Sequence, residues 1–285
     1  METAVGVIGG GIMGCGIAEV AARSGCNVVL REVNQELVQA AERKLEVSLG
    51  TAVRKAKLSQ TECDEIRGRI RFTDSMAEMA DRDLVVEAVI ESLPVKTEIF
   101  GQLGKIARPD ALLATNTSSI PIMQVAAATE RPERVVGLHF FNPAPVMPLV
   151  EIIACEVTSD ETLRRAREFA ADQLGKTTIR AKDRAGFVVN ALLIPYLLSA
   201  IRMAEAGLAS VEDIDQGMVG GCGHPMGPLA LTDLIGLDTT MAVAESMYAE
   251  TKERLYAPPA LLMRKVEAGE LGRKSGRGFF TYPKK

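Results

Sequence analysis

The sequence of 285 residues predicts an α/β fold in which a doubly wound parallel sheet is followed by a second, all-helical C-terminal domain. Short apolar strand patterns alternate with helical patterns through the first two-thirds of the chain, and a glycine-rich turn follows the first strand. The strand patterns stop near Asp183. Single hydrophobic cores usually split at roughly 250–300 residues. We therefore expect two domains, residues 1–184 and residues 185–285.

Short runs rich in Val, Ile and Leu, bounded by Gly, Asp or Asn, have the form of parallel strands buried on both faces. The predicted strands are Ala4–Ile8, Asn27–Arg31, Leu84–Glu87, Leu112–Ala114 and Val135–His139, with weaker strands at Leu149–Ile153 and Thr177–Ile179. The helical patterns between them are Ile12–Ser24, Asn34–Lys55, Thr61–Arg67, Val95–Lys105 and Asp160–Gln173. This alternation is typical of β-α-β units.

After Asp183 the chain has only helical patterns, separated by Gly and Pro. They are Phe187–Ala206, Val211–Val219, Leu231–Glu253 and Pro259–Ala268. The first is apolar on nearly every side, which is typical of a buried helix. Its longest apolar stretch contains Asn190 and Arg202 and is shorter than the about 20 residues that a membrane span requires. We expect no membrane partner.

The charge balance and the cysteines exclude several classes of protein. Lys and Arg total 33 against 37 Asp and Glu, and the net charge of −4 argues against a nucleic-acid or membrane surface. The five cysteines form no C-x-x-C pair, which is typical of reduced thiols. Because His139 and His224 are the only histidines, we expect no metal site. No targeting segment precedes the apolar run at Ala4, so we expect a cytoplasmic protein.

A glycine-rich turn joins the first strand to the first helix. Its pattern, G-x-G-x-x-G, is typical of a Rossmann-type dinucleotide loop when a strand precedes it and a helix follows. Gly9 permits the tight turn, Gly11 lets the backbone approach a pyrophosphate, and Gly14 lets the helix pack closely on the sheet. Ile12 and Met13 open the helix, whose N-terminus would hold the phosphates. The alternative is an ordinary glycine-rich turn, which the surrounding pattern disfavours.

An acidic residue at the end of the second strand is the usual companion of such a loop. Glu32 has this position, and its carboxylate would bind a ribose 2′-hydroxyl and repel a 2′-phosphate. This favours NAD as the cofactor. Arg31 is adjacent and leaves NADP open, although a solvated surface arginine is the simpler interpretation.

His139 and Glu151 form a candidate proton-transfer pair. Oxidation of a secondary alcohol requires a base that takes the hydroxyl proton, and histidine titrates near neutral pH. Such a base needs a partner that fixes its tautomer, and Glu151 follows it in an apolar run. The alternatives are a hydrogen-bonded core histidine and an exposed glutamate on an edge strand.

The polar run Thr115–Ser119 follows a predicted strand, at the edge where α/β sheets bind ligands. Its hydroxyl groups also suit a turn or helix cap before Pro121. A Ser-His-Asp hydrolase is a rival function. We discount it because no G-x-S-x-G elbow surrounds any serine.

Taken together, the motifs resemble the 3-hydroxyacyl-CoA dehydrogenase family, and within it the short bacterial members that act on 3-hydroxybutyryl-CoA. They are Gly9–Ala18 (GGGIMGCGIA), Asn116–Ser119 (NTSS), His139–Glu151 (HFFNPAPVMPLVE), Asp183–Asn190 (DRAGFVVN), His224–Pro228 (HPMGP) and Gly272–Tyr282 (GRKSGRGFFTY). The resemblance implies an oxidoreductase that interconverts (3S)-3-hydroxybutyryl-CoA and acetoacetyl-CoA with NAD or NADP, in fatty-acid or butanoate metabolism. It also implies a homodimer formed through the helical, substrate-binding domain.

The resemblance further implies the roles of individual residues. His139 would be the catalytic base and acid, Glu151 its orienting partner, and Ser118 and Asn190 would hydrogen-bond the reacting oxygen or the thioester. Besides the glycine loop and Glu32, the implied cofactor contacts are Glu91, Lys96, Ser118, Asn142 and Lys274. The implied coenzyme A contacts are Ser48, Lys55 and Ser118, with Lys55 in a basic cluster beside Arg54 and Lys57. The alternative for that cluster is a solvated helix face.

Two rival interpretations stay open at this point. A 3-hydroxyisobutyrate-type dehydrogenase also joins a Rossmann domain to helices, but it relies on a lysine where this chain has Asn190. A structural or sensor protein would keep the fold without the reacting residues, and all of them are present here. Many family members carry Asp where this chain has Glu32, which leaves NADP use open.

Overall fold

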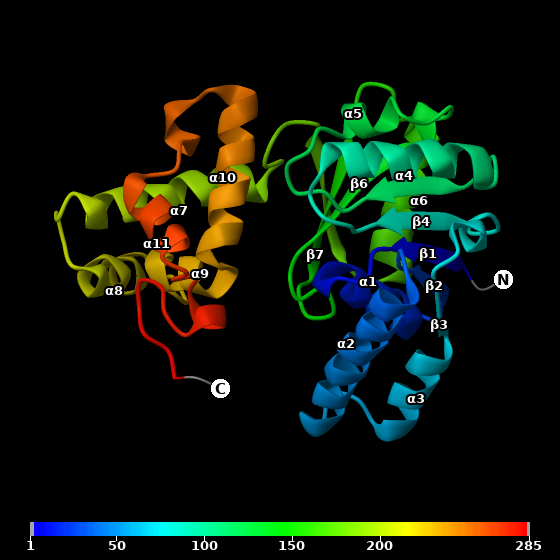
Figure 1. The fold of residues 1–285 in the computed structure, drawn as a ribbon, viewed down its shortest axis with the longest axis horizontal. Helices are drawn as coiled ribbons and strands as arrows, with labels where there is room; N and C mark the ends of the chain where they lie inside the picture. The colour runs from blue at the N-terminus through cyan, green and yellow to red at the C-terminus, as the bar shows by residue number, and fades with distance from the viewer. Residues whose placement is uncertain (1–2, 284–285) are drawn as a thin grey trace. The chain divides into compact units, whose positions relative to one another are not determined.

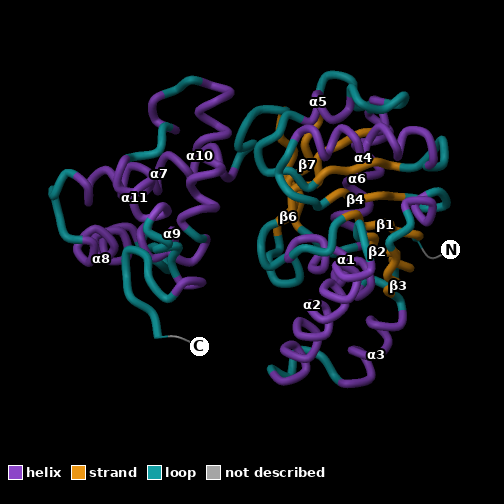
Figure 2. The backbone as a smooth tube through the Cα atoms, in the orientation of Figure 1, coloured by secondary structure: helices purple, strands orange, loops and turns teal. Residues whose placement is uncertain are grey.

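The structure, a computed structural model, describes residues 3–283 and divides into two compact units between Asp183 and Arg184 (Figure 1). The expected boundary lay one residue further along the chain. Among the described residues, every named strand belongs to the first unit, and the second unit is built from helices (Figure 2).

The first unit contains an eight-stranded sheet in the order β3-β2-β1-β4-β5-β6-β7-β8. The strands are β1 (Ala4–Ile8), β2 (Asn27–Arg31), β3 (Ile70–Thr73), β4 (Leu84–Glu87), β5 (Leu112–Thr115), β6 (Val135–Phe140), β7 (Leu149–Ala154) and β8 (Thr177–Lys182). The strands from β3 to β6 are mutually parallel, β7 runs antiparallel to β6, and β8 is parallel to β7. From β1 the chain first adds strands on one side of the sheet and then on the other, which creates a topological switch point between β1 and β4. Ligands of α/β sheets bind at such a point, at the carboxyl ends of the strands.

Some helices of the first unit begin at side chains that cap them. The helices of this unit are α1 (Ile12–Arg23), α2 (Gln35–Arg54), α3 (Gln60–Gly68), α4 (Leu93–Ile106), α5 (Ile122–Ala126) and α6 (Asp160–Arg167), which continues as a π-helical segment, Glu168–Gln173. The Asn34 side chain accepts the Leu37 amide at the start of α2. Ser59 and Glu62 form a reciprocal capping box at the start of α3, which satisfies amides that the helix leaves unpaired.

Successive side chains of each strand point to opposite faces of the sheet, and both faces are buried. On one face Val28, Val86 and Leu138 pack in a core cluster with residues of α1, α2 and α6. On the other face lie Val85 and Leu113, which are also fully buried, and α4 and α5 pack against each other there, as Figure 1 shows. Continuous apolar strands are therefore required, which is the pattern that the sequence displays.

The second unit contains α7 (Val189–Glu205), α8 (Val211–Cys222), α9 (Pro228–Ile235), α10 (Leu237–Thr251) and α11 (Ala260–Glu267). Its core includes Leu198, Ile201, Leu229, Met247 and Leu262, all of which are fully buried. Within the described residues, no helix is both long and apolar enough to span a membrane.

The structure corrects the predicted elements in three places. The sheet is not wholly parallel, since β7 runs against β6. Strand β3 was not predicted, because it is a four-residue edge strand in which only Ile70 is buried. The single helix predicted over Leu231–Glu253 is wrong: Gly236, with φ +104, breaks it into α9 and α10. Only glycine adopts such a backbone conformation readily.

A buried carboxylate anchors the C-terminal segment of the second unit. Asp233, at the end of α9, accepts the amides of Phe279 at 2.8 Å and Phe280 at 2.9 Å and the hydroxyl of Tyr282 at 2.9 Å. Gly278 passes so close to the carboxylate that a Cβ there would lie 1.9 Å from Oδ1. Burial and the bond to Asp233 raise the pKa of the Tyr282 phenol to about 12. The end of the motif Gly272–Tyr282 is therefore anchored by three hydrogen bonds to Asp233.

Asp233→Ala should lower the free energy of unfolding by about 3 kcal/mol, because two amides and a phenol lose a charged acceptor. Urea unfolding followed by circular dichroism measures this loss. Tyr282→Phe is the matched control, since it removes a single hydrogen bond and should cost about 1 kcal/mol. Equal losses in the two variants would contradict the assignment of Asp233 as the anchor.

Candidate active site

The imidazole of His139 faces the carboxylate of Glu151 across strands β6 and β7. The two residues are directly opposite in the strand register. His139 Nδ1 lies 2.7 Å from Glu151 Oε2, and both side chains are buried, His139 at 6% exposure and Glu151 at 0%. A carboxylate only accepts hydrogen bonds, so Nδ1–H donates and Nε2 is the basic nitrogen of the ring.

Antiparallel pairing explains why this contact forms. Residues directly opposite on adjacent strands point to the same face and lie within side-chain contact. His139 and Glu151 are 12 positions apart in the sequence, and the connection between the two strands lies between them. The sequence suggested the pair from the apolar run around Glu151, but the strand direction that brings the two together is a tertiary feature.

The polar run after β5 is held in place by the carboxylate of Glu91. Glu91 Oε1 accepts the Thr117 hydroxyl at 2.5 Å, the Ser118 amide at 2.9 Å and the Ser119 amide at 3.1 Å. The Ser118 hydroxyl lies 3.4 Å from the same oxygen. Loop amides that converge on one acceptor have little freedom, so Ser118 is held in a defined orientation.

Lys96, on α4, lies beneath this loop and is 1% exposed. Its Nζ is 2.7 Å from Glu87 Oε1 and 3.2 Å from Glu91 Oε2, so one ammonium pairs with two carboxylates. Burial tends to raise the pKa of Glu91, but the charge of Lys96 and the hydrogen bonds from Thr117 and Ser118 outweigh it and lower that pKa. Glu91 is therefore ionised and keeps its loop donors at neutral pH.

The sequence assigned no individual role to Glu87 or Asn116, two polar residues that organise this edge of the sheet. Glu87, the last residue of β4, accepts the Thr115 hydroxyl at 2.7 Å and is completely buried. Asn116 Oδ1 accepts the amide of Phe140 at 2.9 Å, which ties the loop to the strand of His139. A glutamate inside an apolar strand pattern is a signal that would have pointed to Glu87.

The glycine loop has the geometry that a dinucleotide requires. Gly9 has φ +101, and a Cβ on Gly14 would lie 1.7 Å from the Gly9 carbonyl, so neither position accepts a side chain. A Cβ on Gly11, in contrast, would meet nothing within 4 Å. The backbone is thus open at Gly11, just before the N-terminus of α1, where a pyrophosphate is expected.

Glu32, directly after β2, turns its carboxylate toward the glycine loop. Oε1 accepts the Gly10 amide at 2.6 Å and Oε2 accepts the Val33 amide at 3.1 Å. Arg31 points elsewhere, with its Nε donating to the Asp74 carbonyl at 3.3 Å. The carboxylate therefore lies where it can meet the ribose of a dinucleotide bound at the loop.

Three exposed aliphatic side chains border the same edge of the sheet. Ile12 follows β1 at 71% exposure, Val33 follows β2 at 60% and Ile90 follows β4 at 70%. Three exposed aliphatic side chains at one edge could pack against a ligand with flat apolar faces, such as adenine. The residues around the switch point therefore fit a dinucleotide.

Comparison with known proteins agrees with this geometry. Residues 4–184 match the 3-hydroxyacyl-CoA dehydrogenase NAD binding domain, and residues 186–282 match the C-terminal domain of 3-hydroxyacyl-CoA dehydrogenase. The chain belongs to the 3-hydroxyacyl-CoA dehydrogenase family. Its first unit is thus the family's NAD-binding domain, and the cofactor is NAD.

Individual relatives are similar over nearly their whole length. The chain is 55% identical to 3-hydroxybutyryl-CoA dehydrogenase of Mycobacterium tuberculosis over 279 residues, which cover 98% of each chain. The crystal structure of M. tuberculosis FadB2 superimposes with a TM-score of 0.96 at 55% identity, covering 98% of each chain. The crystal structure of (S)-3-hydroxybutyryl-CoA dehydrogenase PaaH1 from Ralstonia eutropha gives a TM-score of 0.93 at 42% identity and covers all of both chains.

The remaining expected residues of this dehydrogenase's first unit are Ser48, Lys55 and Asn142. Ser48, on α2, donates its hydroxyl to the buried carboxylate of Glu19 at 2.6 Å. Lys55 caps α2 at its C-terminus and is exposed. Asn142 is exposed just after β6.

Two expected site residues belong to the second unit. Asn190 is half-buried in the first turn of α7. Lys274 Nζ donates to Asp238 Oδ2 at 2.6 Å, so its ammonium is paired within the helical unit. His224 contacts the Tyr196 hydroxyl through Nδ1 at 3.1 Å and packs edge-on against its ring, in keeping with a structural role.

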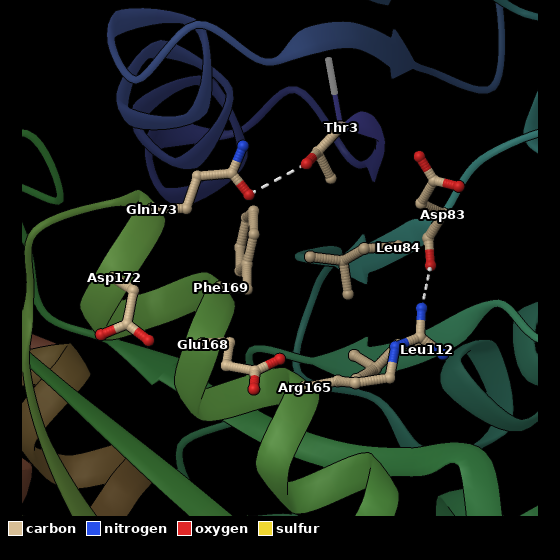
Figure 3. Close-up of a pocket in the computed structure, with 9 residues that line it drawn as sticks. All are labelled: Thr3, Asp83, Leu84, Leu112, Arg165, Glu168, Phe169, Asp172 and Gln173. Atoms are coloured by element: carbon tan, nitrogen blue, oxygen red, sulfur yellow. Dashed lines mark hydrogen bonds between the residues drawn. The ribbon is translucent and has the colours of Figure 1, made fainter. Parts of the chain in front are cut away.

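A hollow of about 480 Å³ lies at the opposite edge of the sheet from the candidate active site (Figure 3). It is lined by Thr3, Asp83, Leu84, Leu112, Arg165, Glu168, Phe169, Asp172 and Gln173. These residues surround the amino-terminal ends of β1, β4 and β5, whereas His139 and Ser118 stand at carboxyl ends. Several of its polar groups pair with one another, including Thr3 with Gln173 and Arg165 with the Asp83 carbonyl. We therefore assign it no part in the reaction.

Lys96→Met should destabilise the protein by about 3–5 kcal/mol, because it leaves the buried carboxylate of Glu87 without its cation and also removes the partner of Glu91. The loss should shrink at lower pH, since protonated carboxyl groups no longer require a cation. Urea unfolding at several pH values measures both effects. Lys105→Met, on the exposed side of the same helix, is the control and should change stability by less than about 0.5 kcal/mol. If the two variants were equally stable, the described network would not hold the loop.

Proposed function

We propose that this protein catalyses the reversible oxidation of (3S)-3-hydroxybutyryl-CoA to acetoacetyl-CoA with NAD as the cofactor. The observation that carries the proposal is the buried His139–Glu151 pair, which is a base with its orienting carboxylate at the carboxyl edge of a dinucleotide-binding sheet. The substrate is supported by the relatives named 3-hydroxybutyryl-CoA dehydrogenase, which match nearly the whole chain.

The proposed reaction removes one hydride and one proton from the substrate. A bound nicotinamide would supply the acceptor for the hydride that leaves C3. His139 Nε2 takes the proton of the C3 hydroxyl as that oxygen becomes a carbonyl, and Glu151 stabilises the imidazolium through Nδ1–H. In the reverse direction His139 returns the proton to the oxygen. The products are acetoacetyl-CoA, NADH and a proton that leaves from the imidazole.

The other residues are proposed to orient the reactants. Ser118, held by Glu91, would hydrogen-bond the reacting oxygen, and Asn190 of the helical unit would bind the oxygen or the thioester. Asn142 would support the nicotinamide, and Lys274 would contribute a further cofactor contact. Lys96 would act through Glu91, because its ammonium is buried against that carboxylate.

Coenzyme A and the cofactor carry phosphates that suit the basic residues of this chain. Lys55 and its neighbours Arg54 and Lys57 would bind phosphates of coenzyme A, with Ser48 beside them. Glu32 would favour NAD over NADP, since its carboxylate repels a 2′-phosphate. Reduced cysteines agree with a cytoplasmic location. The exposed Leu192 and Leu208, at 73% and 75%, support a homodimer through the helical unit.

Steady-state kinetics test the proposed substrate and cofactor. Acetoacetyl-CoA and the C8 and C16 3-ketoacyl-CoAs are each assayed with NADH and with NADPH. The highest kcat/KM is expected for acetoacetyl-CoA with NADH. A preference for C16 would overturn the hydroxybutyryl assignment, and dinucleotide binding without turnover would indicate a sensor.

His139→Gln should lower kcat about 10³-fold, because general-base catalysis of this kind contributes about 10²–10⁴-fold. Glu151→Gln should mainly lower kcat and leave the Kd for NADH nearly unchanged. His224→Gln, which replaces the other histidine, is the control and should keep full activity. Near-normal turnover in His139→Gln would exclude it as the base.

A further inference from the structure

Lys44 contacts the glycine loop from helix α2, although it was not among the expected site residues. Its Nζ donates to the Gly10 carbonyl at 2.9 Å, while the rest of the side chain is exposed. Ala41 lies one helical turn earlier on the same face and packs against Gly10. The approach is so close that a Cβ on Gly10 would lie 2.4 Å from the Ala41 Cβ. The small residues let α2 approach, and Lys44 then reaches the loop backbone.

Both polar groups of Gly10 are held by side chains. Its amide donates to Glu32 Oε1 at 2.6 Å, and its carbonyl accepts Lys44 at 2.9 Å. The Cys15 thiol also lies 3.3 Å from this carbonyl. Burial raises the pKa of Cys15 to about 11, so the thiol stays protonated and donates. The loop is thus fixed by a carboxylate on one side and by an ammonium and a thiol on the other.

The direction of the Gly10 carbonyl determines the direction of the next amide. A trans peptide unit is planar, and its C=O and N–H point in opposite directions. Because the Gly10 carbonyl points at Lys44, the Gly11 amide points away from Lys44. Gly11 is the residue at which the loop is open, with nothing within 4 Å of a Cβ position. Lys44 therefore sets the orientation of a backbone donor at the open face of the loop.

We propose that Lys44 is a cofactor-positioning residue, which holds the Gly10–Gly11 peptide so that its amide meets the dinucleotide pyrophosphate. This inference rests on the proposed function, because it assumes that the loop binds a dinucleotide. The ammonium polarises the peptide that it binds, which strengthens the opposite N–H as a donor. Its positive charge also adds to that of the N-terminus of α1, where phosphates are stabilised.

The test compares Lys44→Met, Lys44→Arg and Arg43→Met. Arg43 is exposed on the same helix, so its replacement removes the same charge one residue away. The Kd for NADH is measured by fluorescence titration without any acyl-CoA, and thermal unfolding is followed in parallel. Lys44→Met should raise this Kd about tenfold, the effect of losing a charge-assisted hydrogen bond of about 1.4 kcal/mol. Lys44→Arg should recover most of the affinity, and Arg43→Met should match the wild type.

Steady-state kinetics add a second readout. In Lys44→Met the KM for NADH should rise while kcat at saturating NADH stays within about twofold of the wild type. The inference is overturned if the Kd for NADH in Lys44→Met stays within about twofold of that in Arg43→Met, even where its melting temperature falls. It is also overturned if only NADPH binding weakens, since Lys44 would then serve a 2′-phosphate.

These outcomes separate the inference from the proposed function. A wild-type protein that binds NADH but does not reduce acetoacetyl-CoA defeats the proposed function and leaves the Lys44 comparison valid. A wild-type protein that reduces acetoacetyl-CoA, with unchanged NADH affinity in Lys44→Met, defeats the inference alone.

Discussion

The pairing of β7 with β6 is the contact on which the candidate site depends. It joins the last parallel strand to an antiparallel one and brings Glu151 opposite His139. A slip of one residue would turn Glu151 to the other face of the sheet. The neighbours of His139 and Glu151 along the two strands maintain this register. Leu138, Val150 and Ile152 point to the opposite face, where they belong to the core cluster. The same apolar packing that stabilises the sheet thus positions the proton-transfer pair.

Carboxylates that accept backbone amides recur throughout the molecule. Glu91 holds the loop of Ser118, Glu32 holds Gly10, and Asp215 and Asp183 accept amides at the first residues of α9 and α5. An ionised acceptor satisfies amides that a helix or strand leaves unpaired, and its charge strengthens each bond. The glycine loop and the loop of Ser118 lack the hydrogen-bond ladder of a strand, so they depend on such anchors more than the strands do.

Burying these charges requires partners. Lys96 and Glu87 are both buried, where an unpaired ion would be strongly destabilised, and the more exposed Glu91 is the second partner of the ammonium. The candidate proton-transfer pair has a similar arrangement, since the buried imidazole of His139 faces the buried carboxylate of Glu151. The two arrangements share the carboxyl edge of the sheet, and Asn116 connects the polar loop to the strand of His139. In both arrangements each buried polar side chain is paired with another polar side chain.

The sequence by itself determined the alternation of strands and helices, the glycine loop, Glu32 and the likeness of His139 and Glu151 to a base and its partner. These features depend on local spacing and on residue chemistry, which a linear pattern displays. The direction of β7, the edge strand β3 and the break at Gly236 were decided by the tertiary structure. So were the burial of Lys96 and the contact of Lys44 with Gly10, because each depends on which surfaces pack together. Long-range packing has no period along the chain, and only the folded backbone shows which charges meet.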